Sequence, residues 1–258
     1  MFRSLRNNHR YLAMGFNDSV RTLLGRVESR RAIDPCEKEA IYRLRHRAYS
    51  REGVLPPGSP EIFKDRFDDN DNGATFGVYI DGKLASSIRI HLVTFQTSVC
   101  PAMTVFRDYI GPLVERGFTV VDPTRFVVDT EFARLFPKLP YATVRICFMA
   151  SDRFHADYVL ATVRTEHQSF YRRLFGHHEV CAGRAYPSLN KPISLMLLDF
   201  RKERERILNR YPFFDYDELE SQQTFGDWMQ PNQTYSLTRP LPKIMTRLDS
   251  NPERVACN

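Results

Sequence analysis

Apolar and polar positions along the chain follow the two-residue period of strands in several places. Residues 158–163 form a continuous apolar run rich in β-branched side chains, which is typical of a strand buried on both faces. Residues 75–80 and 83–93 flank Asp81-Gly82, a strong signal for a two-residue hairpin turn. In the second of these strands, one face is expected to carry Leu84, Ile88, Ile90 and Leu92, and the other Ser87, Arg89 and His91.

Further stretches are also typical of strands. Residues 25–33 form a first one, and residues 118–128 form another that Pro123 interrupts. A proline lacks the N–H that a ladder needs, so either a bulge lies there or the regular strand begins only at Thr124. Residues 179–186 and 193–200 are expected to close the sheet as a hairpin.

Helix signals occur between these strands. In Asp34-Pro35-Cys36-Glu37, the aspartate is a preferred cap, the proline suits the first helical position and the glutamate completes the cap. Directly after residues 158–163, Thr165 with Gln168 fits a capping box, and Gly176 fits a helix end. Another helix is expected over residues 141–154, with a stripe formed by Val144, Cys147, Phe148 and Ser151.

The short helix after residues 158–163 carries the strongest functional signal. Ligands of open α/β sheets bind beyond the carboxyl ends of the strands, so the side chains of this helix are expected to line such a site. Phe170, Leu174 and Phe175 are best explained by core packing. Tyr171 belongs to the same stripe and places a phenol just beyond the strand end.

Length and composition indicate one main core. The chain has 258 residues, of which 42% are hydrophobic. We expect one domain over residues 25–200, an N-terminal extension over 1–24 and a C-terminal extension over 201–258. No apolar run approaches the length of a membrane span, and the first residues lack the pattern of a signal peptide, so a cytoplasmic location is expected.

The formal charge of +6 bears on possible partners. The arginines are scattered among acids without a dense basic run, so no nucleic-acid partner is expected. Local basic clusters suit the docking of an acidic protein, and the basic excess is also compatible with peripheral association with an anionic membrane. These clusters are Arg43, Arg45 and Arg47, and Arg172 with Arg173.

No metal site or disulfide framework is expected. The five cysteines are widely spaced, odd in number and without a C-x-x-C pair. His177, His178 and Cys181 lack a fourth ligand at a matching spacing. The acidic segment Asp69-x-Asp71-x-Gly73 matches part of a calcium loop but lacks the terminal glutamate.

Several motifs, in order along the chain, resemble those of one superfamily. The acyl-homoserine-lactone synthases are similar in Arg45-x-x-x-Tyr49, Asp65-x-x-Asp68, Arg89 and Asp122-x-Thr124-Arg125-Phe126, with Asp122 where that family has glutamate. The N-acyl amino acid synthases look more similar in residues 126–131, Leu139-Pro140-Tyr141 and His167-x-x-Phe170-Tyr171. The resemblance covers about residues 25–200. It implies the GCN5-related N-acyltransferase fold, of the α/β (α+β) class, with a mixed, mainly antiparallel sheet flanked by helices.

The resemblance implies catalytic roles for three residues. Tyr171 is expected to protonate the departing thiolate of a thioester. Asp122 or Glu131 is expected to take the proton of the acceptor amine, directly or through water. Counting with period two places Asp122 and Arg125 on opposite faces of their strand, unless a bulge at Pro123 intervenes.

The same resemblance implies a set of binding residues. Asp68 is expected to bind the ammonium group of the acceptor. Arg89 is expected either to hold the acceptor carboxylate or to pair with Asp65 and Asp68. The rest of the expected substrate-binding set is Arg45, Asp65, Arg125 and His167.

The donor is inferred from a segment without glycine. Residues 129–140 correspond to the loop whose backbone holds the pyrophosphate of acetyl-CoA in other members of the superfamily. A carrier protein presents only one phosphate, so acyl carrier protein is the expected partner. Its acyl-phosphopantetheine is then the donor, and no permanently bound cofactor is expected.

The resemblance thus implies an enzyme that moves a long acyl chain from acyl carrier protein to the amine of an amino acid. One alternative is an acyl-homoserine-lactone synthase, which the late tyrosine helix and the residues after 200 fit less well. Another is a non-catalytic protein that binds acyl chains or a carrier protein. The aspartate at position 122 keeps this last alternative open.

Overall fold

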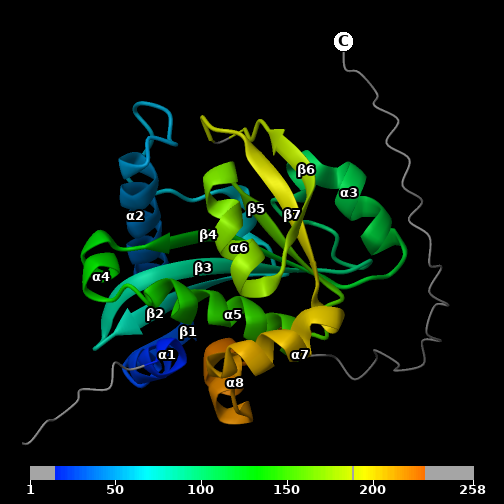
Figure 1. The fold of residues 1–258 in the computed structure, drawn as a ribbon. Helices are drawn as coiled ribbons and strands as arrows, with labels where there is room; N and C mark the ends of the chain where they lie inside the picture. The colour runs from blue at the N-terminus through cyan, green and yellow to red at the C-terminus, as the bar shows by residue number, and fades with distance from the viewer. Residues whose placement is uncertain (1–14, 188, 230–258) are drawn as a thin grey trace, which may run out of the picture.

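A single seven-stranded sheet organises the protein (Figure 1). The computed structural model describes residues 15–187 and 189–229. The strand order is β1-β2-β3-β4-β5-β7-β6, and only β4 and β5 run parallel, which confirms the predicted mixed, mainly antiparallel sheet. The strands are β1 (Val27–Arg31), β2 (Gly73–Ile80), β3 (Lys83–Val93), β4 (Val120–Val128), β5 (Tyr158–Val163), β6 (His178–Arg184) and β7 (Ile193–Asp199).

Helices cover both faces of this sheet (Figure 1). One face carries α5 (Leu139–Arg153), and α1 (Phe16–Leu24), α7 (Phe200–Arg210) and α8 (Glu218–Phe225) add to the same core. The opposite face carries α2 (Pro35–Arg51) and α3 (Met103–Glu115). Two short helices, α4 (Thr130–Leu135) and α6 (Gln168–Phe175), follow β4 and β5 respectively.

Several local signals of the sequence are confirmed. β5 covers the predicted residues 158–163. Asp81 and Gly82 join β2 to β3 with φ angles of 51° and 76°, as a type I′ turn requires. The carboxylate of Asp34 caps α2 by accepting hydrogen bonds from the backbone amides of Cys36 and Glu37, but the carboxylate of Glu37 pairs with Arg30 and does not complete the cap as predicted.

The predicted capping box after β5 is wrong, although the helix exists. Thr165 begins a 3₁₀ turn, Thr165–His167, that has no side-chain cap. Gln168 is buried, and its amide nitrogen donates to Ser194 Oγ at 2.8 Å. Gly176 does end α6 as predicted, in a left-handed conformation with φ of 90°.

Two β-bulges change the faces that strict alternation predicts. One lies in β3, where Val78 pairs with Ser86 but Tyr79 pairs with Leu84. Leu84 therefore packs with the α2 side and not, as predicted, with Ile88, Ile90 and Leu92. The second bulge lies in β4 at Arg125, whose φ is 54°. β4 runs through Pro123, so the alternative in which the strand begins only at Thr124 is wrong.

The chain outside the sheet contributes more structure than the sequence pattern predicts. The polar stretch before β1 forms α1, and its Val20 and Leu23 enter the main core. α3 lies where no helix was predicted. After β7 the main core receives Ile207, Phe213, Phe214, Phe225 and Trp228. The rest of the two predicted extensions, 1–14 and 230–258, lies outside the described residues. Within the described part of the chain, no helix has the length and hydrophobicity to cross a membrane.

Candidate functional site

β4 and β5 separate immediately after their first paired residues. The parallel ladder joins Val120 to Tyr158 and Val121 to Val159, and it extends no further in the described chain. Beyond it, the facing edges of the two strands present backbone N–H and C=O groups to the gap. A ligand that carries amide groups is able to lie in such a gap and pair with the strand edges.

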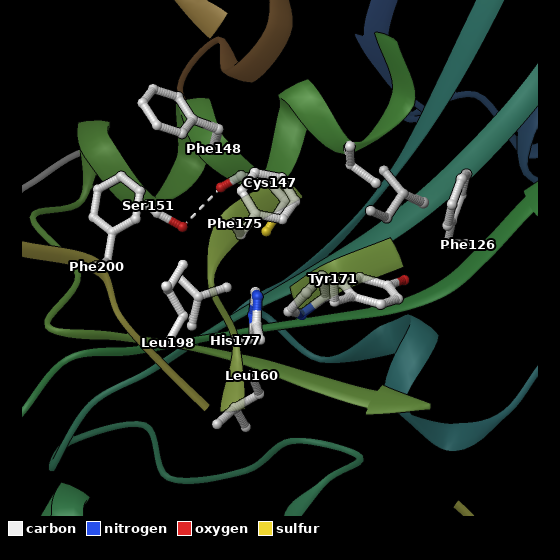
Figure 2. Close-up of a pocket in the computed structure, with 14 residues that line it drawn as sticks. Phe126, Cys147, Phe148, Ser151, Leu160, Tyr171, Phe175, His177, Leu198 and Phe200 are labelled. Atoms are coloured by element: carbon white, nitrogen blue, oxygen red, sulfur yellow. Dashed lines mark hydrogen bonds between the residues drawn. The ribbon is translucent and has the colours of Figure 1, made fainter. Parts of the chain in front are cut away.

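A narrow pocket with a free volume of about 20 Å³ lies at this gap on the α5 face of the sheet (Figure 2). Figure 2 shows Phe126 and Tyr171 toward one end of the pocket and Phe148 and Phe200 toward the other. The rings of Phe148 and Phe200 pack edge to face with their centroids 5.3 Å apart. The wall on α5 is the stripe that the sequence predicts, Val144, Cys147, Phe148 and Ser151. The mostly apolar lining is typical of a site that binds an organic ligand.

Tyr171, the predicted proton donor, lines this pocket from α6. Burial raises the pKa of its phenol well above the usual value, and the neighbouring Cys147 thiol adds to the rise. The phenol therefore keeps its proton at neutral pH. In Figure 2 the hydroxyl points along the pocket toward Phe126. A neutral phenol in this position is able to protonate a thiolate.

His177 is a second polar side chain in the pocket. Its ring is 2% exposed and meets the ring of Tyr171 edge to face, with the centroids 5.7 Å apart. Neither ring nitrogen has a hydrogen-bond partner among the described residues. Burial lowers the pKa of His177 to about 3, so the imidazole is neutral at pH 7. No three or more His, Cys, Asp and Glu side chains of the described chain are grouped so as to hold a metal ion.

Asp122, one of the two predicted bases, lies on the opposite face of β4. Because Pro123 lines the pocket, strand alternation turns Asp122 toward the α3 side. The side chain is completely buried, and its Oδ2 accepts a hydrogen bond from the amide of Ala102 at 3.1 Å. Its Oδ1 has no partner in the part of the chain that the structure describes. Burial raises the pKa of Asp122 to about 6, which suits a base that works near neutral pH.

Five predicted binding residues form one buried ion cluster, which consists of Arg45, Asp65, Asp68, Arg89 and Arg125. Arg45 Nη1 donates to Asp68 Oδ1 at 2.7 Å, and Arg89 Nη1 lies 2.9 Å from the same oxygen. Arg89 also donates to Asp65 Oδ1 at 2.7 Å, and Arg125 Nη2 donates to Asp65 Oδ2 at 2.6 Å. Arg89 thus pairs with the two aspartates, as one of its two predicted alternatives requires. An acceptor ammonium would have to displace an arginine to reach Asp68.

The bulge in β4 is what brings Arg125 into this cluster. Without it, Arg125 would point to the α5 face, but the extra residue turns its side chain to the face of Arg89. The guanidinium carbon of Arg125 lies 4.4 Å from the ring centroid of Phe63 and 5.5 Å from that of Tyr49. Asp122 and Arg125 therefore share a face, which the predicted bulge made possible, although it lies two residues after Pro123.

Glu131 and His167 lie outside both the ion cluster and the pocket. Glu131 is exposed in the first turn of α4. His167 is exposed before α6, where its Nε2 accepts a hydrogen bond from Arg164 Nη2 at 2.6 Å. The segment 129–140, expected as a loop, contains α4, and the Asp129 carboxylate accepts hydrogen bonds from the amides of Glu131 and Phe132. The catalytic role of Glu131 and the binding role of His167 stay predictions.

The family model described as N-acyl amino acid synthase FeeM matches residues 40–199. The chain belongs to this family. The structure of FeeM, from uncultured soil microbes, covers 74% of this chain and 99% of FeeM at 20% identity, with a TM-score of 0.61. TofI, solved in a ternary complex with an inhibitor and MTA, covers 76% of this chain and 99% of TofI at 13% identity, with a TM-score of 0.51. MesI, a CoA-dependent acyl-homoserine lactone synthase, has a TM-score of 0.46 at 18% identity over 67% of this chain and 87% of MesI, which is too distant to bear on the donor. No curated protein matches the chain in sequence.

This member of the FeeM family is an N-acyltransferase with the GCN5-related fold. Sequence reasoning found Tyr171 in its pocket but missed His177 as a pocket residue, because it considered that histidine only as a metal ligand. Phe200 was likewise expected only as the end of a strand, whereas it closes the pocket with Phe148. The signal that the sequence offered for His177 was its position directly after Gly176, the glycine that ends α6.

Proposed function

We propose that this acyltransferase moves a long acyl chain from acyl carrier protein to the amine of an amino acid. The observation that carries the proposal is the apolar pocket at the gap between β4 and β5, with Tyr171 in its wall. Burying a hydrocarbon chain in such a pocket is favourable in proportion to the apolar area removed from water. The amides of a pantetheine arm would pair with the strand edges that face the gap.

The side chains around the gap supply the proton transfers of aminolysis. The amine nitrogen attacks the thioester carbonyl carbon, so that a C–N bond forms and the C–S bond breaks. Tyr171 gives its proton to the leaving sulfur, and Asp122 receives, through a water at its Oδ1, the proton that the amine nitrogen loses. Exchange with solvent then restores both groups. Because Asp122 and the pocket lie on opposite faces of β4, the acceptor approaches from the α3 side and the donor from the α5 side.

The start of α4 supports a carrier protein as the donor. A pyrophosphate needs free backbone amides at the first turn of a helix. Here the amides of Glu131 and Phe132 already donate to the carboxylate of Asp129, which would also repel a phosphate. A carrier protein presents a single phosphate and docks mainly through its acidic surface, which the exposed Arg172 and Arg173 suit.

The ion cluster supports an acceptor that carries a carboxylate. It combines three arginines with two aspartates, so its net charge is positive. Asp122 lies on the same face, where the amine of the acceptor would be deprotonated. A positive field on that face favours an anionic acceptor such as an amino acid.

Purified protein assayed with acyl carrier protein and with CoA, both carrying the same chain, tests this proposal. We expect mass spectrometry to detect N-acyl amino acids, formed at a higher rate with the carrier protein than with CoA. The rate with the carrier protein should fall as salt screens the charges through which it docks. A preference for acyl-CoA that salt does not change would refute acyl carrier protein as the donor. Formation of lactones would indicate a homoserine-lactone synthase, and binding without any product would indicate a non-catalytic protein. Tyr171→Phe serves as the control with the same pocket shape.

A further inference from the structure

His177 is a polar group in a pocket whose walls are mostly apolar, and nothing in the aminolysis described above uses it. The ring is buried, and the pocket-lining residues around it include Leu160, Leu198 and Phe175. Its two nitrogens have no hydrogen-bond partner among the described residues. Buried polar side chains are normally hydrogen-bonded, so an unpartnered one that lines a ligand pocket indicates that the ligand supplies the partner.

The chemistry of the ring narrows the kind of partner. A neutral imidazole has one N–H donor and one acceptor nitrogen. Backbone groups of Tyr171, Val159 and Leu160 raise the pKa of the ring against the effect of burial, but none of them reaches hydrogen-bond geometry. A hydroxyl both donates and accepts, so it pairs with the imidazole in either tautomer, whereas a ketone only accepts from the N–H and a methylene does neither.

The position of His177 narrows the place of that hydroxyl along an acyl chain. The phenol of Tyr171 would protonate the thioester sulfur. Its ring packs edge to face against the ring of His177, with the centroids 5.7 Å apart. Figure 2 shows His177 between Tyr171 and Leu198, on the way toward Phe200. A chain that starts at the phenol and runs toward Phe200 would therefore pass the imidazole within its first few carbons.

We propose that His177 binds a hydroxyl group on the acyl chain close to the thioester, so that the preferred donors carry 3-hydroxyacyl chains. This inference rests on the proposed function, because it takes the pocket to be the site of the acyl chain. It adds a substrate class: chains that carry a hydroxyl group near the carbonyl, beyond the saturated long chain that an apolar pocket alone would select.

The test compares tetradecanoyl, 3-hydroxytetradecanoyl and 3-oxotetradecanoyl groups on the same carrier protein. For the wild type we expect kcat/KM for the hydroxylated donor to exceed that for each of the other two by roughly three- to tenfold, the effect of one neutral hydrogen bond. His177→Phe should remove this preference, so that the hydroxylated and plain donors react with equal kcat/KM. His178→Phe is the matched control, because it makes the same change at the next residue, which is exposed, and should keep the preference.

Equal rates of the wild type with all three donors, or a preference that survives in His177→Phe, would overturn the inference while leaving the proposed function intact. If no donor gives a product, the proposed function fails first. A melting curve of the wild type with free 3-hydroxytetradecanoic acid or tetradecanoic acid then tests the pocket without turnover. A larger upward shift with the hydroxy acid supports the inference, and equal shifts refute it.

Discussion

The substitution Asp68→Asn tests whether the buried ion cluster holds the fold or binds the acceptor. Asp68 has no exposed side-chain surface, and its Oδ1 accepts from Arg45 at 2.7 Å and lies 2.9 Å from Arg89. Its Oδ2 accepts from the backbone amide of Asp65 at 3.0 Å. Asparagine keeps the shape but removes the charge, so Asp65 remains as the one carboxylate in the cluster to face three arginines.

Breaking a buried ion pair from one side costs about 3–5 kcal/mol, since it leaves an uncompensated charge. For a chain of this size each kcal/mol lowers the melting temperature by about 2–4 °C, so a loss of roughly 6–20 °C is expected. Circular dichroism melts and urea titrations measure the loss. Asp69→Asn is the matched control: its carboxylate is 62% exposed and pairs with Lys64 at 2.8 Å, and an exposed pair contributes little.

The pH dependence of the folding stability gives a second measure of the ion pairs that Asp68 makes. Although burial works in the opposite direction, Arg45 and Arg89 hold the pKa of Asp68 below its usual value. A carboxyl group whose pKa is lower in the folded state stabilises the fold fully above its unfolded pKa of about 3.9, and loses this effect as the pH falls through the folded value. The stability advantage of the wild type over Asp68→Asn should therefore shrink below about pH 4.

One result would refute this account of the cluster. If Asp68→Asn melts like Asp69→Asn at neutral pH but needs far more acceptor for half-maximal rate, the carboxylate binds the acceptor ammonium, as the sequence motif predicts. Steady-state constants for donor and acceptor, measured beside the melts, separate these outcomes. A destabilised variant with an unchanged acceptor constant supports the structural role.

Three further predictions concern the gap and its pocket. Tyr171→Phe should slow turnover by roughly 10²–10⁴-fold without lowering the melting temperature, and unchanged turnover in a chemistry-limited step would contradict its role as an acid. Because the pKa of Asp122 is raised to about 6, kcat/KM should fall as the pH drops through 6, and Asp122→Asn should be slow at every pH. Phe200→Leu should shift the products toward longer acyl chains by enlarging the closed end of the pocket, and an unchanged product profile by mass spectrometry would argue against that end as the limit of chain length.

Local signals in the sequence were sufficient to predict much of the sheet. The apolar run of β5 and the Asp81-Gly82 turn predict their elements because neighbouring residues alone determine them. The bulges between Leu84 and Ser86 and at Arg125 depend on what packs across the strands, so alternation alone could not locate them. α1 was missed because only two of its nine residues, Val20 and Leu23, are buried.

The candidate site shows the same division between local and distant information. Tyr171 could be found because it follows a buried strand at a fixed distance. The ion pairs of Asp68 and Arg89 could not be predicted, because a charged side chain that binds a ligand and one that pairs within the fold look the same in the sequence. The neighbours of His177 come from α6, β5 and β7, which only the folded chain brings together.

The segment that follows β7 has a practical consequence for anyone who shortens this protein. The family match ends at residue 199, which invites a cut there. Yet Phe214 and Phe225 are 0% exposed in the main core, and the indole of Trp228 donates to the carbonyl of Asp71 at 3.2 Å. A chain that stopped at the family boundary would expose a large apolar surface on the face of the sheet that carries the pocket, and we expect such a chain to aggregate.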